Sequence, residues 1–375
     1  MPATLEELLK ACVQKTSSDL IIKAGVPPMV RAGSGIAPLE PFPKLAPQDT
    51  AALAFSAMTP QQQEKFKEHG EIDFSYSMPG VGRFRANAFQ QRGTVGMVMR
   101  MIPHTIPTLR DLSLPVATEK LAMEPRGMVL VTGTTGSGKS TTLAAMVEHI
   151  NQNRHAHVMT IEDPIEFLHR DKQSIINQRE VGEDTESFAV ALRSALRQNP
   201  DVILVGEMRD FETISTAMQA AETGHLVFST LHTLDAVETI NRIIAVFPPY
   251  QSMSIRMQMA SILRGIISMR LVQRADGKGR LPAAEVMIVT KTIREAIIDP
   301  EKTRRIPEFI AAGKSQYGMQ SFDQSLYELY KQRLITYEEA RNASTNPQDF
   351  ALRVSGIQSG GDIWGEGVDK AGLNG

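Results

Sequence analysis

The middle of the chain alternates between short, almost entirely apolar segments and longer segments whose apolar residues recur at helical spacing. Near-continuous apolar strands separated by helices are typical of a parallel sheet that helices cover on both faces. We expect strands at 127–133, 157–163, 201–207 and 225–232, and helices at 139–153, 185–199, 211–223 and 236–247.

The pattern becomes mostly helical from about residue 291. The sequence therefore predicts an α/β domain at 116–357 that ends in a helical region at about 291–357. Residues 358–375 are rich in glycine and include the only tryptophan, Trp364, and this composition predicts a disordered tail.

The first part of the chain, residues 1–102, predicts a smaller α+β domain. An amphipathic helix comes first, and a helical stretch at 47–69 contains Thr59-Pro60, a typical helix start. Strands are expected at 19–24, 71–77, 82–90 and 94–102. In the strand at 82–90, Phe84, Ala86 and Ala88 alternate with Arg83, Arg85 and Asn87, which predicts one apolar and one basic face.

Composition limits the kinds of protein that this chain can be. A length of 375 residues favours two domains, and the proline-rich stretch at 103–115 is typical of a linker between them. A net charge of −2 gives no basic field that would favour nucleic acid. Cys12 is the only cysteine, which excludes an intrachain disulfide and a four-cysteine zinc site.

The apolar runs are too short to span a bilayer, which takes about 18 residues. The N-terminal segment is an acidic amphipathic helix and lacks the form of a signal peptide. We therefore expect a cytoplasmic protein, with any membrane association made through a partner.

Residues 133–140, GTTGSGKS, fit the phosphate-binding pattern G-x-x-x-x-G-K-[ST] and lie between an apolar strand and a helix. The glycines let the backbone wrap around phosphates, and the helix N-terminus favours an anion. Lys139 would reach the β- and γ-phosphates of ATP, and Ser140 would bind Mg²⁺. The alternative is a chance match in a glycine-rich turn. The candidate nucleotide-binding residues are Gly133, Thr134, Thr135, Gly136, Ser137, Gly138, Lys139, Ser140 and Thr141.

Carboxylates follow two of the other predicted strands. After DVILV, Gly206 stands where an aspartate is usual in a Walker B strand, and Glu207 is a candidate for holding Mg²⁺ or its water. In TIEDPIE, Glu162 and Glu166 are both candidates for the general base, with Asp163 in support. A solvated loop with acidic caps is the alternative for TIEDPIE.

Two histidines stand at the two ends of the apolar segment 225–232. Because they are seven residues apart, their side chains lie on opposite strand faces and are not expected to share a metal. His232, at the carboxyl end, is a candidate sensor of the γ-phosphate. His225 is included among the nucleotide-binding candidates, and an anchoring role is the alternative for it.

The basic face of the first domain needs a partner of opposite charge. Arg83, Arg85, Arg92 and Arg100 are costly side by side unless anions or carboxylates meet them. Phosphate charge that develops during hydrolysis is one such partner, so these side chains resemble arginine fingers. A solvated sheet face is the alternative.

These motifs together resemble those of the type IV pilus retraction ATPases, which belong to the secretion-type ATPases of the RecA-like class. The resemblance covers about residues 1–357. It is carried by GTTGSGKSTTLAAM, MTIEDPIEF, NQREVG, ALRSALRQNPDVILVGEMRD, AETGHLVFSTLHT and GMQSFDQSLYELY. The chain departs from the family pattern at VRAGSGI and at Met269, where glutamine is common.

The resemblance implies an N-terminal PAS-like domain, a C-terminal RecA-like ATPase domain, and a homo-hexameric ring with ATP and Mg²⁺ between the domains. It implies that Glu166 is the base in an Asp box with Glu162 and Asp163, and that Glu207 is the Walker B acid. His225 and His232 would form a His box, and Arg85 and Arg100 would reach the γ-phosphate. The implied partners are an inner-membrane platform protein and, indirectly, the pilin fibre; the C-terminal helices are linked to retraction.

Other functions stay open at this point. The chain could be the accessory paralogue of the retraction ATPase, which shares its chemistry and would work beside it. An assembly or secretion ATPase generally carries an extra N-terminal domain and a four-cysteine metal site, and one cysteine counts against that. A nucleotide-binding adaptor with little turnover is disfavoured by Lys139, Glu166 and Glu207, and a nucleic-acid motor by the nearly neutral charge.

Overall fold

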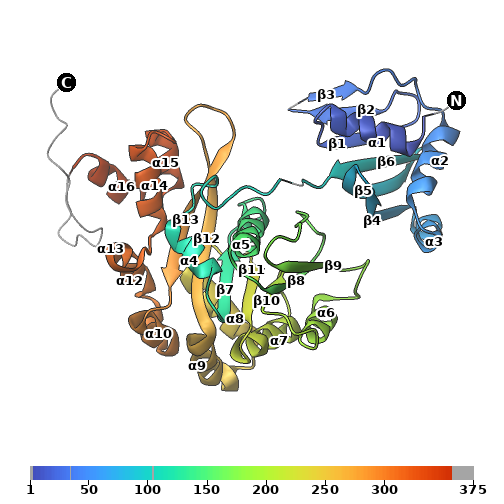
Figure 1. The fold of residues 1–375 in the computed structure, drawn as a ribbon. Coiled ribbons are helices and arrows are strands. Elements are labelled where there is room, and N and C mark those ends of the chain that lie inside the picture. Colours follow the sequence, from blue (N-terminus) through green and yellow to red (C-terminus); the bar gives the residue numbers. More distant parts are fainter. Residues whose placement is uncertain (1–2, 34, 104, 357–375) are drawn as a thin grey trace. The chain divides into compact units, whose positions relative to one another are not determined.

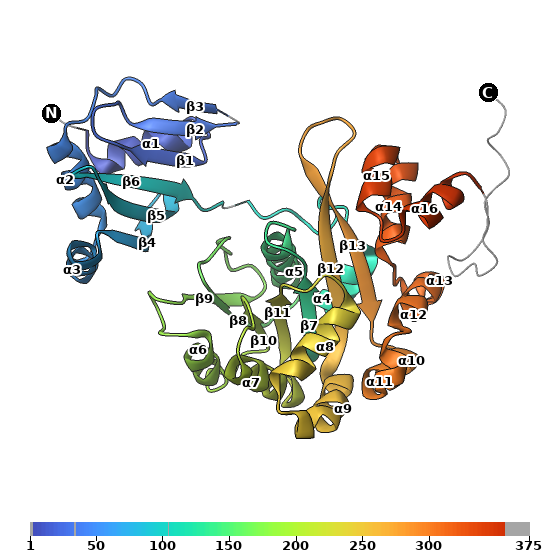
Figure 2. The ribbon, with the colours of Figure 1, turned by 180° about the vertical axis from the view of Figure 1, so that it is seen from behind.

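The computed structural model describes residues 3–33, 35–103 and 105–356, and these form two compact units (Figures 1 and 2). The first unit is Met1–His104 together with Pro164–Leu168, and the second is the rest of the chain. The predicted tail at 358–375 and Trp364 lie outside the described residues. Between 105 and 115 there is neither helix nor strand.

The first unit is a six-stranded antiparallel sheet with helices, as the α+β pattern predicts. The sheet order is β3-β2-β1-β6-β5-β4. Thr59 caps a helix that has Pro60 in its first turn. The elements are α1 Leu5–Gln14, β1 Asp19–Ile22, β2 Met29–Ala32, β3 Gly35–Pro38, α2 Pro47–Ala57, α3 Pro60–His69, β4 Glu71–Met78, β5 Gly82–Gln91 and β6 Thr94–Met101.

Side-chain alternation on β5 builds the core of this unit. Phe84, Ala86 and Ala88 are fully buried, whereas Arg85 on the opposite face is exposed. The amphipathic helix α1 adds Leu8 and its apolar neighbours to the same cluster. Burying one face of an antiparallel sheet leaves the other face free for polar and charged side chains.

The second unit contains a seven-stranded sheet in the order β13-β12-β7-β11-β10-β8-β9, in which only β13 runs antiparallel to its neighbour. The four predicted parallel strands are present. Three strands were not predicted: β9, β12 and β13. The strands are β7 Gly127–Thr132, β8 His157–Glu162, β9 Ile175–Glu180, β10 Val202–Val205, β11 Leu226–Leu231, β12 Leu263–Gln273 and β13 Arg280–Ile288.

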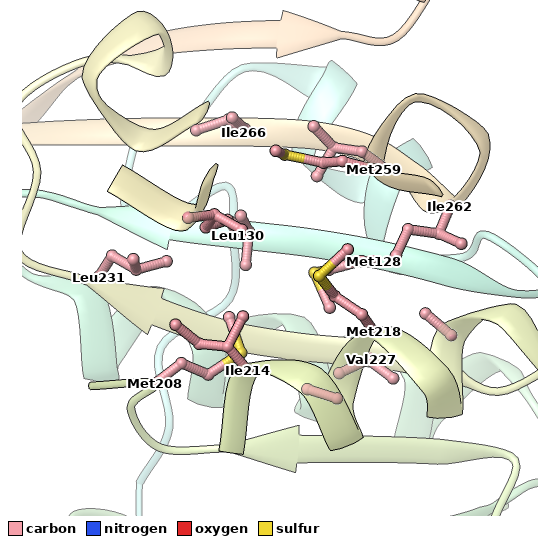
Figure 3. Close-up of a cluster of buried hydrophobic side chains, with 14 of the residues drawn as sticks. Met128, Leu130, Met208, Ile214, Met218, Val227, Leu231, Met259, Ile262 and Ile266 are labelled. Atoms are coloured by element: carbon pink, nitrogen blue, oxygen red, sulfur yellow. The ribbon is translucent and has the colours of Figure 1, made fainter. Parts of the chain in front are cut away.

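Apolar side chains fill both faces of this sheet, as near-continuous apolar strands require. On one face, Met128 and Leu130 of β7 pack with Met218 and Met259 from the covering helices (Figure 3). The helices of this part are α4 Val116–Ala122, α5 Lys139–Asn153, α6 Phe188–Ala195, α7 Phe211–Glu222, α8 Ala236–Val246 and α9 Ser252–Ile262, with a 3₁₀ turn η1 at Pro249–Gln251.

The C-terminal region is helical, as predicted. Its last three helices pack on the β12–β13 hairpin, where Val272 and Leu281 join Leu326, Leu329 and Phe350 in a separate apolar cluster. The helices are α10 Lys291–Ile298, α11 Pro300–Thr303, α12 Ile306–Ala312, α13 Lys314–Tyr317, α14 Phe322–Lys331, α15 Tyr337–Ala343 and α16 Pro347–Val354. Among the described residues, no helix has both the length and the apolar character that a membrane span needs.

Candidate functional site

The loop GTTGSGKS joins the fully buried strand β7 to helix α5. Gly133 adopts φ = 140° and Gly138 adopts φ = 97°, conformations that residues with a side chain rarely adopt. A Cβ at Gly133 would also lie 2.5 Å from the carbonyl oxygen of Met269 on β12. The path of the loop therefore depends on glycine at both positions.

The first turn of α5 is open to an anion. Gly138 occupies the N-cap position and no side chain caps the helix, so the first N–H groups and the helix dipole can act on a ligand. Thr134, Thr135, Gly136 and Ser140 are exposed, Thr141 is half-buried, and Ser137 is buried. The Ser137 hydroxyl has no hydrogen-bond partner among the described residues.

The ammonium group of Lys139 is held inside this loop. It donates to the carbonyl oxygens of Gly133 at 2.8 Å and of Thr134 at 2.9 Å. Burial lowers the pKa of Lys139, and the nearby carboxylate of Glu207 opposes that shift. Because both present acceptors are neutral, a phosphate would give Lys139 a charged partner and a stronger interaction.

Glu207 and His232 come together at the carboxyl ends of the neighbouring strands β10 and β11. Oε2 of Glu207 lies 3.7 Å from Nε2 of His232, and Oε1 lies 2.8 Å from Nε of Arg209. A Cβ at Gly206 would lie 3.2 Å from the carbonyl oxygen of Ile161 on β8. The close approach of β8 thus leaves little room for a side chain at Gly206.

The TIEDPIE segment begins at the end of β8, beside Glu207. The Cα of Glu162 lies 3.3 Å from the position that a Gly206 Cβ would take. Oε1 of Glu162 accepts from the Thr160 hydroxyl at 2.7 Å and from Nε2 of Gln178 at 3.2 Å. Asp163 and Glu166 are exposed, and Glu166 falls in the segment grouped with the first unit. Its approach to the nucleotide therefore stays a prediction.

A cavity of about 390 Å³ opens beside Glu207. Charged side chains such as Asp163, Arg209 and Asp210 line it together with apolar ones such as Val181 and Phe188. None of residues 133–141, all of which the structure describes, lines it. The cavity adjoins the carboxylates of the site and is separate from the phosphate-binding loop.

His225 lies at the amino ends of the parallel strands, opposite the phosphate-binding loop, and its assignment to the nucleotide stays a prediction. It precedes β11, and its carbonyl oxygen accepts from the N–H of Gly127, at the start of β7, whereas the phosphate-binding loop follows the end of β7. The six residues of β7 span roughly 20 Å at about 3.3 Å each. Nδ1 of His225 lies 2.9 Å from the carbonyl oxygen of Ala220, an anchoring contact.

The arginines of the first unit form part of a row across its sheet. Arg85 is paired with Arg100, Arg100 with Asp19, and Asp19 with Arg31, on neighbouring strands. The buried Asp19 carboxylate accepts from Nε of Arg100 at 2.8 Å and lies 3.5 Å from Nε of Arg31. The Arg100 side chain is nevertheless 70% exposed, so most of its donors stay available.

No group of three or more His, Cys, Asp or Glu residues in the described ranges could hold a metal by itself. Mg²⁺ that binds with a nucleotide keeps several waters and takes one or two protein ligands together with phosphate oxygens. The exposed Ser140 hydroxyl and the Glu207 carboxylate are oxygen donors of the kind that Mg²⁺ prefers.

Comparison with known proteins identifies the family. The family model described as Type II/IV secretion system protein matches residues 96–346. The chain belongs to the Type II/IV secretion system protein family. The match includes the phosphate-binding loop, TIEDPIE, Glu207, His225 and His232.

Two relatives that resemble the chain over nearly its whole length are pilus ATPases. The type IV pilus retraction ATPase PilT of Pseudomonas aeruginosa is 45% identical over 92% of this chain and 99% of its own. The type IV pilus ATPase PilU of the same organism is 43% identical over 95% of this chain and 93% of its own. A crystal structure of the pilus retraction motor PilT with bound ADP has a TM-score of 0.84 and 48% identity, and it covers 92% of this chain and 98% of that one.

Sequence reasoning missed the side chains that hold the candidate residues in place. Asp19 binds Arg100 across 81 positions of sequence, and Gln178 binds Glu162 from the unpredicted strand β9. In the sequence, Asp19 is visible only as an acidic residue at the start of a short apolar strand. Its contact with Arg100 can be inferred only when the strand order is known. The Gln178 contact carried no local signal.

Proposed function

We propose that this protein is an ATPase that hydrolyses ATP to power the retraction of type IV pili. The observation that carries the proposal is one arrangement within the second unit: Lys139 sits at an uncapped helix N-terminus, and Glu207 acts on it electrostatically while lying 3.7 Å from His232. The 45% identity to PilT supports pilus retraction as the work that hydrolysis performs.

ATP binding would replace the present partners of Lys139. The phosphates take the place of the Gly133 and Thr134 carbonyl oxygens, and the N–H groups at the start of α5 donate to them. Ser140 and Glu207 would hold Mg²⁺, Glu207 directly or through water. When bound, that ion neutralises charge on the phosphate oxygens.

Glu162 and Glu166 share the role of candidate base. The family resemblance favours Glu166, whereas Glu162 lies at a strand end beside Gly206 and Glu207, in the unit that contains Lys139. Asp163 supports them. Changing each glutamate to glutamine in turn distinguishes the two. The variant at the true base should lose turnover and keep ATP binding.

The remaining charges come from other parts of the chain. His232 senses the γ-phosphate from the end of β11. Arg85 and Arg100 supply positive charge to the same phosphate from the first unit, as arginine fingers do in other phosphoryl-transfer enzymes. A homo-hexamer with ATP between its domains would thereby couple hydrolysis to domain movement.

The proposed place of work is the cytoplasmic face of the inner membrane. The ring acts there on a pilus platform protein and through it on the pilin fibre, without nucleic acid. A role as the accessory ATPase is the second candidate, since the 43% identity to PilU nearly equals the value for PilT. The chain would then work beside a paralogous retraction ATPase.

Purified protein tests the enzymatic part of the proposal. The wild type should hydrolyse ATP, and Lys139→Ala should remove at least about 99% of that activity, because Lys139 has no substitute at the phosphates. The matched control is Lys120→Ala, which changes an exposed lysine on α4 and should leave turnover unchanged. Turnover in the wild type no higher than in Lys139→Ala would instead indicate an adaptor that binds nucleotide.

A further inference from the structure

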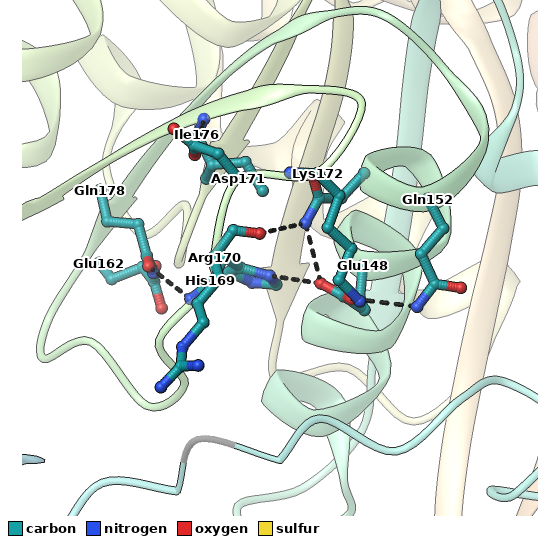
Figure 4. A network of polar contacts seen from close by, with 10 residues as sticks. Glu148, Gln152, Glu162, His169, Arg170, Asp171, Lys172, Ile176 and Gln178 are labelled. Atoms are coloured by element: carbon teal, nitrogen blue, oxygen red, sulfur yellow. Dashed lines mark hydrogen bonds and ion pairs between the residues drawn. The ribbon is translucent and has the colours of Figure 1, made fainter.

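A buried carboxylate on α5 is not used by the mechanism above. Glu148 lies nine residues after Lys139 on the same helix and is only 7% exposed. Four side chains meet it (Figure 4). They are Lys172, Gln152 at 3.0 Å, Asn151 at 3.1 Å and His169, whose Nδ1 lies 3.5 Å from Oε2.

The charge of Glu148 is stabilised where it lies. Burial by itself would raise the pKa of this carboxyl, but the hydrogen bonds from His169, Lys172, Gln152 and Asn151 hold its pKa well below the ordinary value. Glu148 is therefore ionised at neutral pH. Losing one of the hydrogen bonds to a buried carboxylate costs free energy. The observed contacts of Glu148 are therefore strongly favoured over arrangements that lack one of them.

Two of the four partners come from outside the helix. His169 and Lys172 belong to the segment that follows TIEDPIE, and backbone contacts strengthen the attachment of that segment to α5. Asn151 donates from its side chain to the carbonyl oxygen of Arg170 at 2.8 Å and accepts from the N–H of Lys172 at 3.0 Å. We call Glu148, Asn151, His169 and Lys172 the Glu148 clamp.

The clamp also reaches the start of TIEDPIE. The N–H of His169 donates to Oε1 of Gln178 at 2.9 Å, and Nε2 of Gln178 donates to Glu162 (Figure 4). Residues 163–168, which include Asp163 and Glu166, therefore run between two anchored residues, Glu162 and His169. Both ends of this segment are therefore tied to the second unit, whereas Pro164–Leu168 between them are grouped with the first.

We propose that Glu148 and His169 are positioning residues of the ATPase: they fix the two ends of residues 163–168, at Glu162 and His169, to the helix that begins at Lys139, so that the candidate base Glu162 keeps its place relative to the phosphate-binding loop. The inference rests on the proposed function. The geometry supports it, because α5 starts at the phosphate-binding loop and Glu148 lies on the same helix. A base that drifts by about 1 Å can lose roughly 100-fold in rate.

The sharpest test uses His169, because its loss leaves the Lys172 pair of Glu148 in place. His169→Ala should lower kcat by about tenfold or more and change the Kd of a fluorescent ATP analogue by less than about twofold. His169→Asn should restore kcat to within about threefold of wild type, because the Asn amide can donate near the position of Nδ1. His149→Ala is the matched control on α5: the His149 ring makes no hydrogen bond among the described residues, so kcat should not change.

A second readout does not depend on turnover. Hydrogen exchange at residues 163–168 should be faster in His169→Ala than in the wild type and in His149→Ala, while the melting temperature changes by only a few degrees. Unchanged kcat and unchanged exchange in a folded His169→Ala would overturn the inference. Equal losses in His169→Ala and His169→Asn, in step with melting temperature, would also overturn it.

The two proposals fail in different ways. If the wild-type protein does not hydrolyse ATP, the proposed function fails. Faster exchange at 163–168 in His169→Ala would still show that His169 attaches the end of this segment to α5. If the wild type hydrolyses ATP and His169→Ala does so equally well, only the positioning role fails.

Discussion

Nε2 of His232 lies 3.7 Å from Oε2 of Glu207, at the ends of two strands that are neighbours in the sheet. The strand register fixes this pair, since Val205 of β10 is level with Ser229 of β11. If His232 contacts the γ-phosphate as proposed, a change there would also alter the surroundings of Glu207, the acid that is proposed to hold Mg²⁺. His225, at the other end of β11, has no such carboxylate contact among the described residues.

Substitution of His232 should affect catalysis, whereas substitution of His225 should affect stability. His232→Ala should lower kcat by about tenfold, because the γ-phosphate contact is lost while nucleotide binding continues. His225→Ala should leave kcat within about twofold and cost on the order of 1 kcal/mol of unfolding free energy through the lost contact with Ala220. Steady-state kinetics and thermal melting of both variants check this; a larger kcat loss in His225→Ala would refute the assignment.

Asp19 should control the use of Arg100. Asp19→Asn removes the charge that holds Arg100 at 2.8 Å, so we expect turnover to fall toward that of Arg100→Ala with little change in ATP binding. The measurement is kcat and Kd of the two single variants and the double variant. A double variant much slower than either single variant would mean that the residues act independently.

The same carboxylate should contribute a pH-dependent part of the stability. Although burial raises the pKa of Asp19, the hydrogen bonds of Ser18 and Arg100 outweigh this and lower it. The folded state therefore gains stability above the unfolded pKa, about 3.9, and loses it as pH falls. Melting of wild type and Asp19→Asn should differ most at pH 7 and converge in acid; a constant difference would contradict the charge argument.

Glu285 should behave in the opposite way. It is 6% exposed and accepts from the N–H of Ala236 at 2.9 Å, and burial raises its pKa from 4.5 to about 7. Between those pH values only the unfolded chain releases the proton, so rising pH favours unfolding, and above about 7 the full penalty remains.

Glu285→Gln keeps an acceptor for Ala236 and removes the charge. It should raise the unfolding free energy by on the order of 2 kcal/mol at pH 8, with the gain fading toward pH 4. Melting curves of both proteins across this range provide the check. Destabilisation of the variant at pH 8 would show that the negative charge is needed there, with Arg270 as its partner.

Gly206 should not accept the aspartate that is usual in a Walker B strand. A side chain there would approach the Ile161 carbonyl oxygen to 3.2 Å and the Glu162 Cα to 3.3 Å, and both are backbone atoms of or beside β8. Gly206→Asp should therefore cost roughly 1–3 kcal/mol and reduce turnover. Higher activity in this variant would show that the strands can separate and that Glu207 does not replace the missing acid.

The phosphate-binding loop could be predicted because its information is local: an apolar strand, three glycines and Lys139-Ser140 follow one another directly. The basic face of β5 could be predicted for the same reason. The hairpin β12–β13 could not, because α9 continues into β12 without a turn signal and the apolar residues of β12 fit either structure. Yet the carbonyl oxygen of Met269 in this hairpin lies close to Gly133. The Thr132 hydroxyl also donates to the Ser268 hydroxyl at 3.0 Å.

Contacts between distant positions explain the other omissions. Asp19 and Arg100 meet only after β1 and β6 pair, and Glu148 and His169 meet only after the segment behind TIEDPIE folds back on α5. His225 was grouped with His232 because both flank one apolar segment. His225 and His232 lie at opposite ends of the parallel strand β11, so we expect them to have different roles.

Surface pili in a strain that lacks this gene test the central claim most directly. Retraction by ATP hydrolysis predicts excess pili with lost twitching motility, and rescue by the wild-type gene but not by Lys139→Ala. Loss of surface pili in the deletion strain would contradict retraction and would indicate a motor for pilus assembly.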